Sequence, residues 1–247
     1  MLLDLCLDFD AKAMPARPWW RDGAVLGAIL GAVRANDLWL DFRWVGREGG
    51  ALSRLDPGEL LAETRAWEDR GYVLHARREG GLEASHLSLG LRGALLRVQL
   101  SADRAAVHAR GAAILDAMIE LAFACRAAFG GRAVFGEGCA IRVPGLDFET
   151  VEPPRTHPTL SLEGLVVFAD AAYFAACDAL DPDAHLVADL DALRAARLPR
   201  GAKRFERDGV LVLSWLDGAL TTAAMARACA RGQAWLARTL ALPEAGW

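Results

Sequence analysis

Three short strand-like runs follow one another in the middle of the chain, and they constrain the fold more than any other feature. The runs are 72–78, 84–91 and 94–100. Gly80-Gly81 and Arg92-Gly93 separate them, and pairs of this kind favour tight hairpin turns because glycine accepts positive backbone φ angles. Closely spaced strands joined by tight turns pair with their neighbours in sequence. This stretch therefore predicts an antiparallel β-meander.

The N-terminal segment predicts a further strand with one acidic face. Apolar residues occupy alternate positions at Leu3, Leu5, Leu7 and Phe9, and the positions between them hold Asp4, Cys6, Asp8 and Asp10. A period of two is typical of a half-buried strand, whose side chains alternate between the core and the opposite face. We therefore expect the aspartates to share the face that points away from the core.

Helix signals flank and follow the meander. The expected helices are 22–34, 57–70, 101–129, 170–180, 181–198 and 221–240, and additional strands are expected at 38–45, 133–143 and 164–168. Several of these helices begin at residues that cap helices well, among them Asp22, Ser101 and the Asp181-Pro182 pair. Strands that cluster between helices, without regular alternation, predict an α+β fold in which antiparallel sheet packs against several helices.

Two further signals bear on the organisation of the chain. Asp208-Gly209, between the alternating runs 203–206 and 210–215, is the strongest short-range hairpin signal in the sequence. Prolines at 144, 153, 154 and 158 disfavour both helix and strand over one stretch. We expect a single α+β domain over 1–247, in which lobes 1–143 and 160–247 are joined by this proline-rich linker.

Composition argues against several classes of function. The chain has 28 basic and 32 acidic residues, a formal net charge of −4, and so lacks the basic excess that nucleic-acid binding needs. Its N-terminus lacks the basic flank and cleavage site of a signal peptide, and no uncharged apolar stretch approaches the roughly 20 residues of a membrane helix. Five scattered cysteines, at 6, 125, 139, 177 and 229, form no Cys-x-x-Cys pair. We expect a soluble, cytoplasmic protein with reduced thiols and no cofactor.

Asp8-Phe9-Asp10 is one candidate for chemistry. Placed at the end of an apolar strand, it resembles the Asp-x-Asp nucleophile and acid pair of haloacid-dehalogenase-like phosphotransferases, which implies a hydrolase or phosphotransferase using Mg²⁺. Those enzymes place Thr or Val two residues after the second Asp, where this chain has Lys12. The competing interpretation is a solvated acidic face.

His75 and His86 are the second candidate. If Gly80-Gly81 forms a two-residue turn, the two histidines lie directly across the hairpin and share one face of the sheet. A zinc site needs at least one further protein ligand, and no Asp, Glu or Cys is placed by sequence to supply it. The pair is therefore either a metal or acid-base site or a simple cross-strand pair on a sheet face.

Two more groups of residues have competing interpretations. Trp19-Trp20 is either an anchor for a protein partner or a pair packed onto the following helix. Asp116 and Glu120, four residues apart, fall opposite the apolar stripe of their helix, so we expect them on its outer face. Carboxylates on an outer face lack the burial that would fit them for acid-base chemistry.

Four features of the C-terminal part share one layout. They are Gly-Leu-Val-Val-Phe-Ala-Asp at 164–170, Leu198-Pro199-Arg200-Gly201-Ala202, Asp208-Gly209 with the run 210–215, and Gln233-Ala234-Trp235-Leu236. In this layout the chain resembles bacterial immunity-type proteins of polymorphic-toxin systems. The resemblance implies a cytoplasmic α+β protein that binds a cognate toxin and performs no reaction.

The sequence therefore favours a non-enzymatic binding protein, most concretely a toxin-neutralising immunity protein. We expect its contact surface to comprise Asp4, Asp8 and Asp10 with Trp19 and Trp20, because an acidic strand complements a basic toxin domain. The alternative is a metal-dependent hydrolase or phosphotransferase that uses Asp8 and Asp10, or His75 and His86.

Overall fold

The fold was examined in a computed structural model of residues 1–247. The structure describes residues 3–10, 23–38, 44–47, 53–54, 74–77, 86–92, 95–129, 134–136, 139–143, 164–216 and 220–240. The chain divides into two compact units, Leu2–Val134 and Phe135–Trp247 together with Met1. The expected linker at 144–160 and the expected helix at 57–70 lie outside the described residues.

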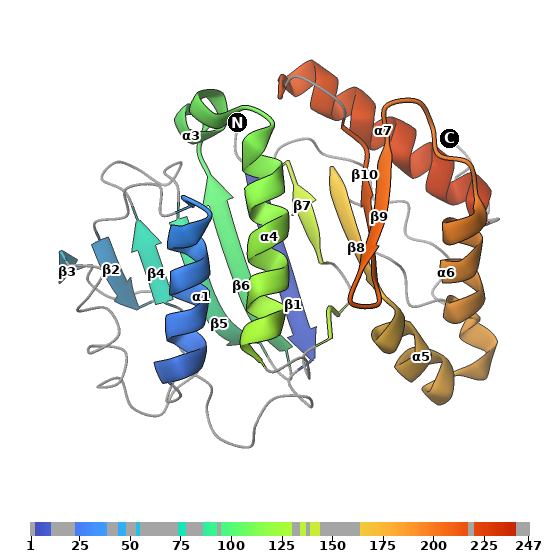
Figure 1. The fold of residues 1–247 in the computed structure, drawn as a ribbon, viewed down its shortest axis with the longest axis horizontal. Helices are drawn as coiled ribbons and strands as arrows, with labels where there is room; N and C mark the ends of the chain where they lie inside the picture. Colours follow the sequence, from blue (N-terminus) through green and yellow to red (C-terminus); the bar gives the residue numbers. More distant parts are fainter. Residues whose placement is uncertain are drawn as a thin grey trace. The chain divides into compact units, whose positions relative to one another are not determined.

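The N-terminal unit is built on an antiparallel sheet (Figure 1). Its strands are β1 (Leu3–Asp10), β2 (Trp44–Arg47), β3 (Ser53–Arg54), β4 (Leu74–Arg77), β5 (His86–Arg92) and β6 (Leu95–Ala102). They lie in the order β3-β2-β4-β5-β6-β1, so β4, β5 and β6 pair with their neighbours in sequence. The predicted meander is therefore confirmed, and β1 extends it by pairing with β6.

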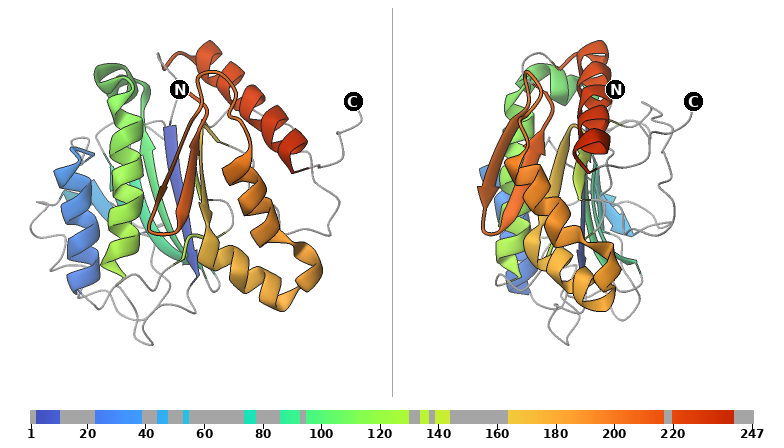
Figure 2. Two further views of the ribbon diagram at one scale, coloured as in Figure 1. Left: turned by 45° about the vertical axis from the view of Figure 1, so that its right-hand side comes forward. Right: turned by 90° about the vertical axis from the view of Figure 1, so that its right-hand side faces the viewer.

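The core of this unit lies between the sheet and two helices, α1 (Gly23–Ala35) and α4 (Ala113–Ala128). Figures 1 and 2 show both helices on the same face of the sheet. The alternating apolar residues of β1 are fully buried, and the Phe9 ring packs against Phe129 with centroids 5.4 Å apart. The period of two in the sequence therefore identified the core face of β1 correctly.

The helix expected over 101–129 is wrong in its start and in its continuity. Ser101 belongs to β6, and the true cap is Asp103, whose side chain accepts a hydrogen bond from the Ala106 N–H at 2.9 Å. The segment then splits into α3 (Arg104–Arg110) and α4, because Gly111 takes a φ of 54° that an α-helix cannot contain.

Two strand predictions also need correction. Of the strand expected over 38–45, residues 44–45 belong to β2, Trp44–Arg47, and 39–43 lie outside the described residues. Leu38 instead closes α1, since its N–H donates to the Val33 carbonyl at 2.7 Å and Asp37 has a φ of 54°. Within the described part of the strand expected over 133–143, the strand β7 comprises Ala140–Arg142.

The C-terminal unit contains an antiparallel sheet in the order β7-β8-β10-β9. The further strands are β8 (Val166–Asp170), β9 (Lys203–Arg207) and β10 (Val210–Ser214), and the helices are α5 (Ala171–Leu180), α6 (Leu186–Ala195) and α7 (Thr222–Thr239). The predicted hairpin is confirmed: Asp208 and Gly209 take φ angles of 51° and 77°, as a primed two-residue turn requires.

Buried apolar residues and one carboxylate hold this unit together. Every residue of β8 and β10 is buried, and the Trp215 and Trp235 rings pack with centroids 5.5 Å apart. Asp170, 1% exposed, accepts hydrogen bonds from the N–H groups of Ala172 at 3.0 Å and Phe135 at 3.1 Å. Asp170 thereby caps α5 and also holds the backbone at Phe135 in place. The fold is α+β, as the sequence predicted.

Candidate functional site

The sheet register places the predicted acidic and histidine residues on one face of the N-terminal sheet. Residues that pair directly across an antiparallel ladder share a face. Asp4 pairs with Ser101, Asp8 with Arg97, and Asp10 with Leu95. In β5, His86 also pairs with Ser101. The candidate residues on β1 and those on the meander therefore belong to the same face, opposite the face that carries the buried leucines of β1.

The two histidines share this face but are not directly opposite each other, which corrects the predicted register. His75 pairs with Ser88, and His86 pairs with Arg77. A two-residue turn at Gly80-Gly81 would have paired His75 directly with His86. The observed register differs from the expected one by two residues. A shift of two preserves the face, whereas a shift of one would have reversed it.

We call this surface the polar sheet face. By register its polar positions are Asp4, Cys6, Asp8, Asp10, Arg54, His75, Arg77, His86, Ser88, Arg92, Arg97, Gln99 and Ser101, and Trp44, Gly46, Gly90 and Leu95 share the face. Acids occupy β1, while histidine and arginine positions lie on β3 to β6. The face therefore holds positions of both charge signs.

The carboxylates of β1 differ in their surroundings. Gln99 Nε2 donates to Asp4 Oδ2 at 3.3 Å, while the buried Asp4 Oδ1 finds no hydrogen-bond partner within the described part of the chain. Asp8 is 6% exposed, so the interpretation of a fully solvated acidic face does not hold there. Because a buried carboxylate oxygen without a donor carries a desolvation cost, Asp4 contributes less to stability than a fully hydrogen-bonded carboxylate would.

The remaining predicted residues fall in three groups. Trp19 and Trp20 lie outside the described residues. Asp116 and Glu120 are exposed on α4, which confirms their predicted outer-face position. Among the residues that the structure describes, no three His, Cys, Asp or Glu side chains are grouped as a metal site would need.

The described thiols include two that are unsuited to nucleophilic chemistry. Burial raises the pKa of the Cys125 thiol to about 12 and that of the Cys229 thiol to about 12. Because the thiolate is the reactive form, both side chains are inert near neutral pH. They pack in the cores of the N-terminal and C-terminal units respectively.

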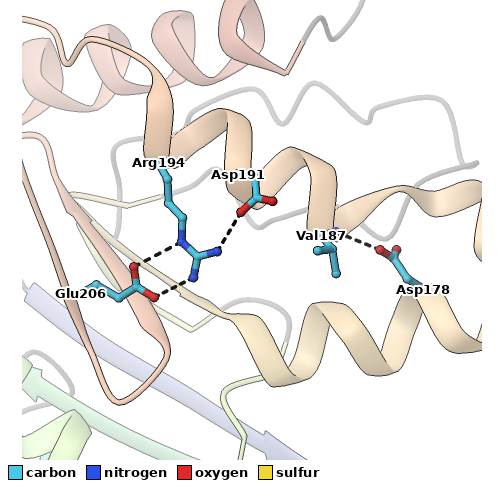
Figure 3. Close-up of polar contacts among 5 residues, drawn as sticks. All are labelled: Asp178, Val187, Asp191, Arg194 and Glu206. Atoms are coloured by element: carbon cyan, nitrogen blue, oxygen red, sulfur yellow. Dashed lines mark hydrogen bonds and ion pairs between the residues drawn. The ribbon is translucent and has the colours of Figure 1, made fainter.

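A second charged surface, which the sequence analysis did not single out, lies where α5 turns into α6. Its residues are 178–191, and we call it the α5–α6 corner. Asp178 Oδ1 accepts from the Leu186 N–H at 2.8 Å. Its Oδ2 accepts from the Val187 N–H at 2.9 Å (Figure 3). These bonds satisfy two of the free donors at the start of α6, where His185 makes no side-chain cap. The run of aspartates without Lys or Arg was the available sequence signal.

An ion-pair group ties the other end of α6 to β9. Arg194 donates to both carboxylate oxygens of Glu206, at 3.2 and 2.6 Å, and to Asp191 Oδ1 at 2.9 Å (Figure 3). The hydrogen bonds to Glu206, and then to Asp191, raise the pKa of the Arg194 guanidinium above its usual range. Arg204 also donates to the Leu193 and Ala196 carbonyls at the end of α6. The helix is therefore held at both ends.

Comparison with known proteins shows the fold. No protein-family model matches the chain, and no curated protein matches it. A solved structure described as Pseudomonas aeruginosa T6SS (type VI secretion system) protein PA0821 is similar to it, with a TM-score of 0.55 and 15% sequence identity. The similarity covers 97% of this chain and 72% of that chain. None of the described helices is both long and apolar enough to cross a membrane.

Proposed function

We propose that this chain is a non-enzymatic, cytoplasmic binding protein that neutralises a cognate bacterial toxin, as immunity proteins do. The observation that carries the proposal is the fold, which is similar over 97% of the chain to a protein described as belonging to a type VI secretion system. The resemblance of the C-terminal layout to immunity-type proteins points in the same direction.

Charge supports a basic toxin domain as the partner. The acidic strand β1 and the α5–α6 corner carry carboxylates, and complementary charge speeds association and selects the partner. Asp4, Asp8 and Asp10, together with Trp19 and Trp20, are the contact residues proposed from the sequence. Of these, Asp8 is 6% exposed, so its carboxylate acts on a partner through the local field more than by direct contact.

Growth rescue tests the proposal. Each product of the genes adjacent to that of this chain is expressed alone and together with the chain, and any product that stops growth is then purified with the chain. We expect co-expression to restore growth and the two proteins to elute as one complex. Failure of the chain to restore growth, with no complex formed, would overturn the proposal.

The same purified protein tests the enzymatic alternative. Release of phosphate from a phosphomonoester in the presence of Mg²⁺, lost in Asp8→Asn and Asp10→Asn, would contradict a purely binding role and support the phosphotransferase hypothesis. We expect no turnover by the wild-type chain above that of the two variants.

A further inference from the structure

We infer that the α5–α6 corner is a docking surface for a basic protein partner. The partner contacts two exposed apolar residues, Leu180 and Val187, which we call the knob, and the exposed aspartates of the same segment, which we call the rim. The inference rests on the proposed function for the identity of that partner, and it names a surface that the sequence did not predict. Three properties of the corner support it: exposed apolar side chains, a backbone fixed by hydrogen bonds, and negative charge. The charge also argues against partners that are themselves negatively charged.

The first property is apolar exposure. Leu180, the last residue of α5, is 84% exposed, and Val187, in the first turn of α6, is 39% exposed. These are two of the three large hydrophobic side chains exposed in the described part of the chain, and both belong to this corner. Single exposed leucines are common on protein surfaces, but here two exposed apolar residues stand in one short segment with exposed aspartates, a combination typical of interaction surfaces.

The second property is a fixed backbone. The two hydrogen bonds from Leu186 and Val187 to Asp178 hold the start of α6 against α5, and Figure 3 shows the bond from Val187. Asp181 accepts from the Asp183 N–H at 3.2 Å and so caps the short 3-10 turn η3 (Pro182–Ala184). The knob is therefore presented on a preorganised corner, which lowers the conformational entropy lost when a partner binds.

The third property is concentrated negative charge. Residues 178–191 contain five aspartates and no Lys or Arg, so the formal charge of the segment, −5, exceeds in magnitude the −4 of the entire chain. Asp181 and Asp183 are exposed, whereas the exposed Asp191 is ion-paired with Arg194 at 2.9 Å, which offsets its charge. Asp181 and Asp183 therefore supply the acidic rim at this corner.

This charge decides between classes of partner. Nucleic acids and the cytoplasmic surface of membranes are themselves negatively charged, so the corner repels them. A protein surface with basic residues around an apolar depression complements both the rim and the knob. A basic toxin domain offers that chemistry, and a second copy of this chain is the competing occupant that the test separates.

The test compares affinities for the neighbouring gene product whose toxicity the chain relieves, carrying a substitution that inactivates it. Leu180→Ser removes the more exposed of the two apolar side chains of the knob. Asp181→Asn with Asp183→Asn removes two charges of the rim and keeps a side chain at 181 that can cap η3. Phe205→Ser, at a β9 residue that is 38% exposed, is the control for lost apolar surface. Asp116→Asn with Glu120→Gln, on the exposed side of α4, is the control for lost charge.

We expect Leu180→Ser to weaken binding by at least about tenfold, as for a residue central to an interface. The rim variant should slow association several-fold at low salt and flatten its salt dependence, since exposed charges are screened within about 10 Å at 0.1 M. Both control variants should bind like the wild-type chain.

The outcomes distinguish this inference from the proposed function. Wild-type binding that Leu180→Ser and the rim variant leave unchanged would overturn the inference alone. A change in self-association of Leu180→Ser, with toxin affinity unchanged, would overturn it in favour of a second copy of the chain. No binding by the wild-type chain would overturn the proposed function and, with it, the basic toxin as occupant of the corner.

Discussion

The two units of the chain use carboxylates in opposite ways. In the N-terminal unit, the acids of β1 stand in a sheet, where Asp4 is hydrogen-bonded to Gln99 and Asp8 is almost completely withdrawn from solvent. In the C-terminal unit, one carboxylate, Asp170, is buried to organise backbone, while Asp181, Asp183 and Asp191 at the α5–α6 corner are exposed. A carboxylate on a strand is partly screened by its neighbours across the ladder, whereas a carboxylate on a helix corner is available to a partner.

We therefore expect buried and exposed carboxylates to contribute to different properties, the buried ones to stability and the exposed ones to binding. Asp170 should matter for folding and little for binding, and the exposed aspartates of the corner should matter for binding and little for folding. The following predictions test this division by pairing a residue of one unit with a counterpart in the other.

The largest effect is expected at Asp170. Asp170→Ala removes the acceptor of two N–H groups in a buried site and should lower the free energy of unfolding by about 3 kcal/mol. Asp4→Ala in β1 removes one long hydrogen bond and a partly uncompensated oxygen, and should cost less than about 1 kcal/mol. Urea unfolding of both variants measures the difference, and equal losses would contradict the division.

Two helical glycines should differ in sign. A Cβ at Gly232 in α7 would lie 2.4 Å from the Trp215 ring, so Gly232→Ala should destabilise by about 2 kcal/mol through overpacking. At Gly31 in α1 a Cβ meets nothing within 4 Å, so Gly31→Ala should stabilise by about 0.5–1 kcal/mol through helix propensity. Thermal unfolding of the two variants checks both signs, and stabilisation by Gly232→Ala would show that the Trp215 contact is not tight.

Alkaline pH should weaken both units through their buried thiols. The folded-state pKa values of Cys125 and Cys229, about 12, lie above the ordinary value of 9.0, so unfolding releases a proton between these pH values. The stabilising effect is complete below pH 9 and is lost as pH rises, by about 1.4 kcal/mol per pH unit for each thiol. Cys125→Ala and Cys229→Ala should each reduce this slope between pH 9 and 11. Unchanged slopes would mean that the thiols ionise alike in the folded and unfolded states.

The smallest effect is expected at Asp178. Asp178→Ala leaves the N–H groups of Leu186 and Val187 without their acceptor and should cost about 1 kcal/mol, the typical value of a helix cap. Asp103→Ala, which removes the cap of α3 in the N-terminal unit, should cost a similar amount. Hydrogen exchange at the first turns of α6 and α3 measures the two losses separately, and unaltered exchange at Leu186 and Val187 would exclude the capping role.

Local signals explain why the elements of the C-terminal unit were predicted closely. Asp208-Gly209 alone defines its hairpin, Asp170 caps α5, and Thr221 caps α7 by accepting from the Ala224 N–H. Each signal acts within three residues along the chain, so its outcome depends little on distant contacts. The expected start of a helix at Asp181-Pro182 was correct in position, although the turn there is 3-10 and α6 begins at Leu186.

Long-range pairing explains what the sequence did not predict in the N-terminal unit. The observed register of β4 on β5 pairs Arg77 with His86, so the pairing of His75 and His86 could not be read from Gly80-Gly81. Their common face was predictable because only the parity of the register matters for it. The withdrawal of Asp8 from solvent and the exposure of Leu180 depend on tertiary packing, and no local pattern encodes either.

The most direct test of the central claim is a calorimetric titration of the wild-type chain with the inactivated toxin domain, at low and at physiological salt. If the chain neutralises its toxin by binding, the titration should show one chain per toxin domain, with an affinity that falls as salt rises. No heat of binding at either salt concentration, with both proteins folded, would contradict the account.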